Sequence, residues 1–172
     1  ITYDRAGALM DLEVQQPVQD ARVVDAAGGP AVPDQPVLER IAARGALRVG
    51  VIDGRLPYAF PNSRGQIVGL DIELAHQLAR DLGVGLELVR FRFEEIETVL
   101  ARGACDVVMS GIVVTPGRAA RLTLSDPYLE ETLGFLVPDH ARDRFLEWAE
   151  LQSRPSLRVL TANLEYFADQ LA

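Results

Sequence analysis

The feature that most constrains this chain is an alternation of apolar runs and amphipathic stretches between residues 47 and 114. The apolar runs have the length and composition of buried strands: 47–53 (LRVGVID), 86–91 (LELVRF) and 105–114 (CDVVMSGIVV). The stretches between them have helical spacing: 69–83 and 93–103. The order strand, helix, strand, helix, strand predicts an α/β protein with a mostly parallel sheet and helices on both faces.

The first amphipathic stretch, GLDIELAHQLARDLG, predicts a helix with an apolar stripe. Four leucines recur at every fourth position, with Ala75 and Ala79 beside them: Leu70, Leu74, Leu78 and Leu82. We expect Asp71 to cap this helix and Gly83 to end it. His76 is expected on the outer flank of the helix, as an ordinary flank residue.

The flanking segments are less regular. A short helix is predicted for residues 37–45. Residues 1–36 are expected to be a linker or extension. This segment could also contain an edge strand, although Pro17 interrupts the pattern. Beyond the 93–118 region we expect four further elements: a strand at 131–138, a helix at 143–152, a strand at 157–160 and a helix at 164–172. The last two are expected to open a second α/β unit that this chain does not complete. The start ITYD, without Met, is typical of a piece of a longer protein.

Composition narrows the function classes. The 172 residues carry a net charge of -8, which argues against a nucleic acid or an anionic membrane surface as partner. No run reaches the ~18 consecutive apolar residues of a membrane-spanning helix. The single cysteine, Cys105, excludes an internal disulfide and is expected to be a small buried residue.

Signals for catalysis are weak. The two histidines, His76 and His140, are isolated, and no serine lies in a Gly-x-Ser-x-Gly turn. The glycines do not form a phosphate or dinucleotide fingerprint, and the acidic clusters at 94–97 and 130–131 are expected to be solvated faces rather than metal ligands. We therefore predict no metal, no cofactor and no catalytic residue.

One arginine stands where helices disfavour it. Thr115 and Pro116 predict an N-cap and the first residue of a helix, which places Arg118 in the first turn. The start of a helix carries a partial positive charge, so a cation there is unfavourable unless an anion binds. Free backbone N–H groups with a guanidinium would form a carboxylate site. The alternative is a surface ion pair with Asp126 or Glu130.

Five stretches in register resemble a known family across residues 47–137, about half the chain. They are LRVGVID (47–53), LPYAF (56–60), GQIVGLDIELAHQLARDLG (65–83), FEEIETVLARGACDVVMSGIVVTPGR (93–118) and LSDPYLE (124–130). The sequence resembles the bacterial extracellular solute-binding proteins of family 3, the polar amino-acid class. The resemblance implies a periplasmic binding protein type 2 fold, in which two α/β lobes close on a small solute.

The resemblance also implies a set of ligand-binding residues. The arginine at the Arg118 position grips the ligand's α-carboxylate, and the aromatic at the Tyr58 position packs on the ligand, although Tyr58 could instead fill the core. The backbone at Ser110 and Gly111 lines the cleft. Asp53, at a strand's carboxyl end, could contact a ligand amine or only cap its loop. The full expected set is Arg118, Tyr58, Ser110, Gly111, Ile112, Asp53 and Thr115.

Two departures from the family pattern affect this reading. Val113 replaces the usual Thr or Ser whose hydroxyl accepts from the ligand's ammonium, so an amino acid is less favoured than another small carboxylate. The second departure is length, because the chain contains only the beginning of the second lobe. We expect a linker or extension at 1–36, the first lobe at 37–138 and the beginning of the second lobe at 139–172.

The resemblance implies an extracytoplasmic or periplasmic binding module of a transporter or sensor, as a soluble domain of a membrane protein. Its exposed lobe face would favour a homodimer. Two alternatives stay open: a cyclohexadienyl dehydratase-like enzyme of the same fold, and a degenerate interaction domain that binds no small molecule.

Overall fold

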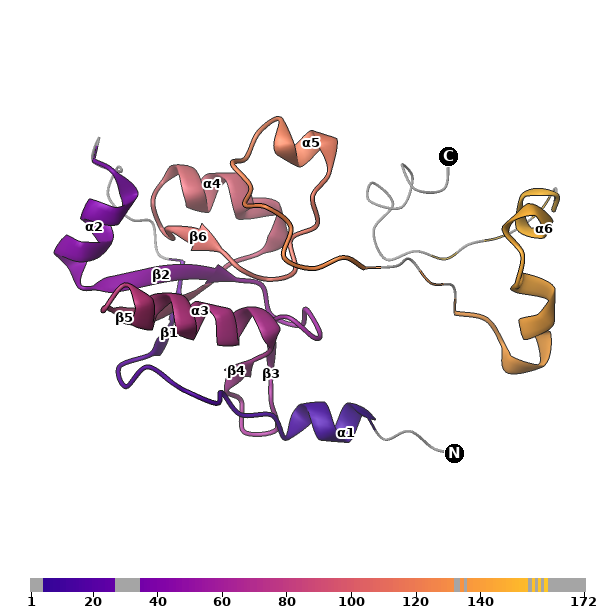
Figure 1. Cartoon of the computed structure of the whole chain (residues 1–172), viewed down its shortest axis with the longest axis horizontal. Coiled ribbons are helices and arrows are strands. Elements are labelled where there is room, and N and C mark those ends of the chain that lie inside the picture. Colours follow the sequence, from indigo (N-terminus) through magenta and orange to yellow (C-terminus); the bar gives the residue numbers. More distant parts are fainter. Residues whose placement is uncertain are drawn as a thin grey trace. The chain divides into compact units, whose positions relative to one another are not determined.

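The computed structural model of the chain has two compact units, residues 1–113 and 114–172. The described residues are 5–26, 35–131, 134, 136–154, 156, 158 and 160. The first unit contains the sheet and the helices that pack on it (Figure 1).

The sheet of the first unit is parallel throughout, as predicted. Its four strands are ordered β1-β5-β2-β6. Their bounds are Arg22–Asp25 for β1, Gly85–Arg90 for β5, Ala46–Val51 for β2 and Val107–Val108 for β6. In the register, Val49 lies opposite Leu88 on one side and Val107 on the other. The carboxyl ends of all four strands therefore meet at one edge, where α/β sheets bind ligands.

The predicted helices are present with small shifts in their bounds. Helix α2 covers Val37–Arg44, α3 covers Leu70–Asp81, and the second stretch divides into the 3-10 helix η1, Phe93–Glu95, and α4, Ile96–Ala101. Gly45 ends α2 with φ +70°, a left-handed conformation that glycine adopts without a steric penalty. Gly83 follows α3 with φ +66°, in agreement with the expected end of that helix.

The stretch between β2 and α3 contains a small hairpin. Strands β3, Phe60–Pro61, and β4, Ile67–Val68, pair antiparallel. The Asn62 side chain closes the turn, because its Oδ1 accepts from the backbone N–H groups of Arg64 and Gln66, each at 2.9 Å. Strands this short leave too little alternation in the sequence to be recognised.

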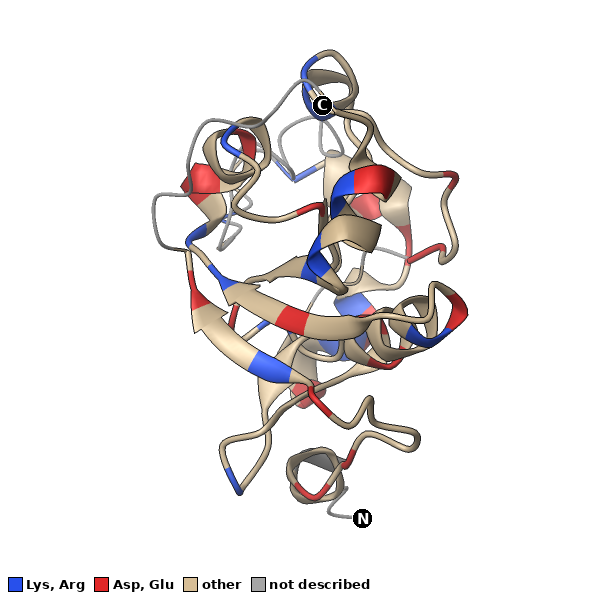
Figure 2. Cartoon of the chain, turned by 90° about the vertical axis from the view of Figure 1, so that its left-hand side faces the viewer, with Lys and Arg blue, Asp and Glu red and all other residues tan. Residues whose placement is uncertain are grey.

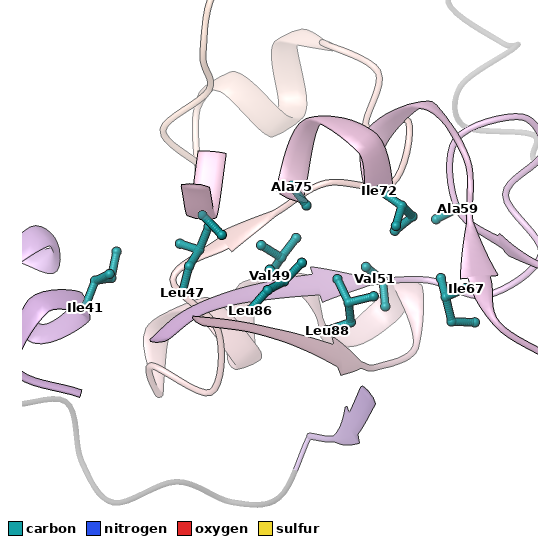
Figure 3. Close-up of a cluster of buried hydrophobic side chains, with 11 residues drawn as sticks. Ile41, Leu47, Val49, Val51, Ala59, Ile67, Ile72, Ala75, Leu86 and Leu88 are labelled. Atoms are coloured by element: carbon teal, nitrogen blue, oxygen red, sulfur yellow. The ribbon is translucent and has the colours of Figure 1, made fainter. Parts of the chain in front are cut away.

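The hydrophobic core lies between the sheet and α3. Val49 and Leu86 on the strands meet Ile72 and Ala75 on the helix (Figure 3), and all four side chains are at most 1% exposed. Each large apolar side chain buried in this way contributes about 1.5–3 kcal/mol. On the other face of β2, Gly50 leaves space for Cys105, since an added Cβ would lie 3.0 Å from its Sγ. Cys105 is 1% exposed, which confirms the prediction that it is buried.

The prediction that the four leucines form the buried stripe of α3 is wrong. The leucines at every fourth position are 36–41% exposed, and the buried face instead consists of Asp71, Ile72, Ala75, His76 and Ala79. With about 3.6 residues per turn, a spacing of four drifts by about 40° per step, so the leucines spiral around the helix. The alanines lie on the face that meets the sheet, where their small side chains allow a close approach.

The N-terminal extension is part of the first unit. Helix α1 covers Arg5–Met10, and β1 is an edge strand paired with β5, which confirms the edge strand that the sequence left open. Between them the chain binds α3: the Gln15 N–H donates to Glu73 at 2.8 Å, and the Val18 N–H donates to Nδ1 of His76 at 3.1 Å. His76 is 4% exposed, so the expected flank position is wrong.

Charged residues face each other across the β1 edge of the sheet. Figure 2 shows acidic and basic positions opposed on neighbouring strands. The carboxylate of Glu87 on β5 accepts from Arg22 on β1 and, at 2.7 Å, from Arg48 on β2. Burial alone would raise the pKa of Glu87, but the hydrogen bonds and charges of the two arginines hold it below its usual value.

The second unit contains short helices. Helix α5 covers Pro116–Ala119, the 3-10 helix η2 covers Asp139–Phe145, and α6 covers Trp148–Gln152. The helix expected at 143–152 is therefore interrupted, at Leu146 and Glu147. The described residues of 131–138 do not form the expected strand. Residues 157 and 159 of the strand expected at 157–160, and the whole helix expected at 164–172, lie outside the described residues.

None of the helices in the described ranges combines the length and the apolar content that crossing a bilayer requires.

Candidate ligand-binding site

The carboxyl ends of β2 and β6 are joined by one serine. Ser110 is fully buried, and its hydroxyl both accepts from the Ile52 N–H, at 2.8 Å, and donates to the Ile52 carbonyl, at 3.3 Å. These bonds use the hydroxyl within the protein. The side chain of Ser110 therefore fixes the backbone of this edge.

Gly111 forms a tight turn directly after Ser110; we call these two residues the 110–111 turn. Its φ of +61° lies in the left-handed region, and an added Cβ would stand 2.3 Å from Cδ2 of Tyr58. Its N–H donates to Oδ2 of Asp71 at 2.6 Å. Asp71 is fully buried on α3, so a charged acceptor inside the unit holds the turn in place.

Asp71 was expected to cap α3, and that prediction is wrong. The N-cap position is Gly69, and the first N–H groups of the helix donate to carbonyls of the preceding loop: Leu70 to Pro57 at 3.0 Å and Asp71 to Tyr58 at 3.1 Å. Because the loop satisfies these donors, the Asp71 carboxylate is not needed as a cap, and it accepts from the 110–111 turn.

Tyr58 lies in the loop between β2 and β3. Its side chain is 8% exposed, and its ring packs against Gly111. The structure thus brings together Tyr58, Ser110 and Gly111 of the expected set. Ile112, the next residue, is half-buried.

Asp53 lies apart from these residues, in a hollow that we call the second hollow. Its carboxylate forms an ion pair with Nε of Arg90 at 3.2 Å, and its side chain is 46% exposed. The hollow measures about 620 Å³ and does not include Tyr58, Ser110 or Gly111. It is lined by Asp25, Ala26, Ile52, Asp53, Arg90, Phe91, Arg92, Phe93, Glu94 and Glu95.

Arg55 is a residue of this edge that the sequence reading did not single out. Its Nη2 donates to the Gly111 carbonyl at 3.1 Å, and its Nε donates to the Ser110 carbonyl at 3.4 Å. The guanidinium also lies 6.0 Å from the centre of the Phe93 ring. Its position just after a strand end was the only available signal.

The predicted helix start is confirmed within the second unit. Thr115 is the N-cap of α5 with extended backbone, its Oγ1 accepts from the Arg118 N–H at 3.3 Å, and Pro116 is the first helical residue. Thr115 and Arg118 thus have the local geometry that the sequence indicated.

The remaining reactive groups offer little for catalysis. Burial raises the pKa of the Cys105 thiol to about 12, which keeps it protonated and unreactive. No group of three or more metal-ligating side chains occurs among the described residues.

Comparison with known proteins identifies the family. The model of the bacterial extracellular solute-binding proteins, family 3, matches residues 47–163. The chain belongs to this family. The α/β lobe with its parallel sheet is accordingly a periplasmic binding protein type 2 fold.

Three curated relatives illustrate the range of the family. The chain is 45% identical over 80 residues to the membrane-bound lytic murein transglycosylase F of Vibrio vulnificus, 30% identical over 104 residues to the L-cystine-binding protein TcyJ of Escherichia coli, and 31% identical over 112 residues to the cyclohexadienyl dehydratase of Pseudomonas aeruginosa. These matches cover 46%, 60% and 64% of this chain. They span only 15%, 39% and 42% of the respective relatives.

Two solved structures are similar at the level of the fold. The ancestral cationic amino acid solute-binding protein AncCDT-1 is 41% identical with a TM-score of 0.53, covering 55% of this chain and 41% of its own. The arginine-bound form of domain 1 from TmArgBP is 38% identical with a TM-score of 0.50, covering 52% of this chain and 71% of its own.

Proposed function

We propose that this chain supplies the first lobe of an extracytoplasmic module that binds a small carboxylate-bearing solute, either an amino acid or a related organic acid. In this proposal residues 37–138 form the first lobe, residues 139–172 begin the second, and residues 1–36 are an extension. The observation that carries the proposal is the 110–111 turn, which is fixed at the carboxyl edge of the sheet by Ser110, Asp71 and Tyr58. Preorganisation of this kind lowers the entropic cost of holding a ligand.

Each residue of the proposed site has a distinct role. Arg118 pairs with the ligand carboxylate as a planar fork, and the N–H groups that follow Thr115 contribute further donors. The backbone of Ser110, Gly111 and Ile112 lines the cleft, with the ring of Tyr58 beside it. Asp53, at the end of β2, contacts a ligand group that extends toward the second hollow.

The proposal also covers the cellular location of the module and the protein to which it belongs. The murein transglycosylase F of Vibrio vulnificus is membrane-bound, and this similarity supports a periplasmic domain within a larger membrane protein that acts in transport or sensing. The arginine-bound form of an isolated domain 1 supports binding by a single lobe. Such binding is expected to be weak because one lobe buries only part of a ligand. A second copy of the chain could cover the exposed lobe face.

Calorimetric titration tests this function. The chain is titrated with L-amino acids, dicarboxylates and cyclic carboxylic acids, and the titrations are repeated with Arg118→Ala and with the exposed control Arg102→Ala. We expect at least one compound to bind, at least tenfold weaker binding to Arg118→Ala, and unchanged binding to Arg102→Ala. Equal binding to all three proteins would refute the role of Arg118.

Two other functions are each favoured by one observation. Similarity to cyclohexadienyl dehydratase favours an enzyme of the same fold, and turnover of a cyclic carboxylic acid by the chain would establish it. The burial of Tyr58 and the internal use of the Ser110 hydroxyl favour a domain that binds no small molecule. If no compound of the calorimetric panel binds, the result would support a domain that binds no small molecule.

A further inference from the structure

Arg55 extends from the loop after β2 to the segment after β6 and is fixed there by three contacts. Two of them are hydrogen bonds to the carbonyls of the 110–111 turn, at 3.1 Å to Gly111 and 3.4 Å to Ser110. The third is the face of the Phe93 ring, 6.0 Å away. These contacts place the guanidinium against the 110–111 turn.

The positive charge of Arg55 has no carboxylate partner among the residues that the structure describes. Within the described ranges, no carboxylate forms an ion pair with it, although the chain has an excess of acidic residues. Two acidic residues of this edge are otherwise engaged. Asp53 pairs with Arg90 at 3.2 Å, and Asp71 accepts from the Gly111 N–H at 2.6 Å.

This arrangement is unfavourable for an ammonium group. A ligand ammonium at the 110–111 turn would share the carbonyls that accept from Arg55, and it would stand beside a second cation. The hydroxyl that could otherwise accept from it is absent, because the residue at that position is Val113. A buried ammonium without acceptors is expensive.

We infer that Arg55 makes the site selective for small anions that carry no ammonium group, with dicarboxylates favoured over amino acids. This inference rests on the proposed function and names its ligand class. A guanidinium has five N–H donors in a planar fork. Arg55 uses Nε and Nη2 toward the turn, which leaves further N–H donors for a carboxylate of the ligand.

The test compares ligands that differ only in the amine. Succinate and L-aspartate share a four-carbon dicarboxylate skeleton, and glutarate and L-glutamate form a second such pair. Each is titrated into the full chain, Arg55→Met, Arg55→Lys and the control Arg102→Met, after circular dichroism has shown that every variant is folded. Met keeps the length of the side chain without its charge, and Lys keeps the charge without the fork.

We expect succinate to bind the unmodified chain at least tenfold more tightly than L-aspartate. Arg55→Met should reduce that ratio to about one, Arg55→Lys should retain a ratio above one with weaker succinate binding, and Arg102→Met should change nothing. A preference for L-aspartate, or an unchanged ratio in Arg55→Met, would overturn the role of Arg55 and leave the proposed function intact. No binding by any of the four ligands would overturn this inference, and the proposed function would fall with it only if the other compounds of the calorimetric panel also failed to bind.

Discussion

Replacing Gly111 with alanine tests whether the 110–111 turn is as tightly fixed as its geometry indicates. Two costs add. A non-glycine residue at φ +61° pays about 1–2 kcal/mol for the left-handed conformation. The new methyl group would stand 2.3 Å from the Tyr58 ring, and overpacking of a buried site typically costs about 1–3 kcal/mol. Gly111→Ala should therefore lower the free energy of unfolding by about 2–5 kcal/mol.

A matched glycine separates the two costs. Gly83 has φ +66°, and an added Cβ there would meet no atom within 4 Å. Gly83→Ala should therefore show only the conformational cost of about 1–2 kcal/mol. The assay is urea unfolding followed by far-UV circular dichroism, in which the difference appears as a lower midpoint for Gly111→Ala.

A double-mutant cycle with Tyr58→Ala then assigns the second cost. Removal of the ring should relieve the clash, so the two substitutions should couple favourably by about 1–3 kcal/mol. If Gly111→Ala costs no more than Gly83→Ala, or if the coupling is zero, then Tyr58 does not pack on the turn and the site is not preformed as described.

Three further predictions concern buried polar groups. Burial lowers the pKa of His76, whose Nδ1 accepts from the Val18 N–H, so the folded state keeps the neutral ring. The neutral ring's contribution to stability is complete above the unfolded pKa of about 6.5 and is lost as the pH falls below it. Urea unfolding at pH 7.5 and 5.5 should therefore show a smaller loss of unfolding free energy for His76→Gln than for the unmodified chain. Asp71→Ala leaves the buried Gly111 N–H without its acceptor and should cost about 1–3 kcal/mol in the same assay, and a loss below 0.5 kcal/mol would contradict this role. The Cys105 thiol, with a pKa of about 12, should resist iodoacetamide at pH 8 in the folded chain and react in urea; rapid labelling of the folded chain would disprove its burial.

The sequence predicted elements wherever local signals decide the structure. The strands at 46–51 and 85–90 are short apolar runs, and Gly45 and Gly83 end their helices through conformations that favour glycine. The Thr115 cap is similarly local, because the donor and acceptor are three residues apart. These features need no knowledge of distant contacts.

Features that depend on distant contacts were missed. The buried face of α3 depends on what packs against it, and the burial of His76 depends on a segment 58 residues earlier in the chain. The carboxylate of Asp71 serves Gly111, 40 residues away, rather than its own helix. Arg55 likewise finds its acceptors 55 and 56 residues later. Side-chain periodicity and capping rules contain no information about such pairs.

The most direct test of the central claim is an NMR titration of the full chain with succinate, observed at the backbone amides. Binding at the carboxyl edge of the sheet should shift the amide signals of Ser110, Gly111 and Arg118 most strongly, together with the Nε signal of Arg55. The same titration of Arg118→Ala should reduce these shifts at equal succinate concentration. Shifts confined to residues 90–95 around the second hollow, or no concentration-dependent shifts, would contradict the proposed carboxylate site.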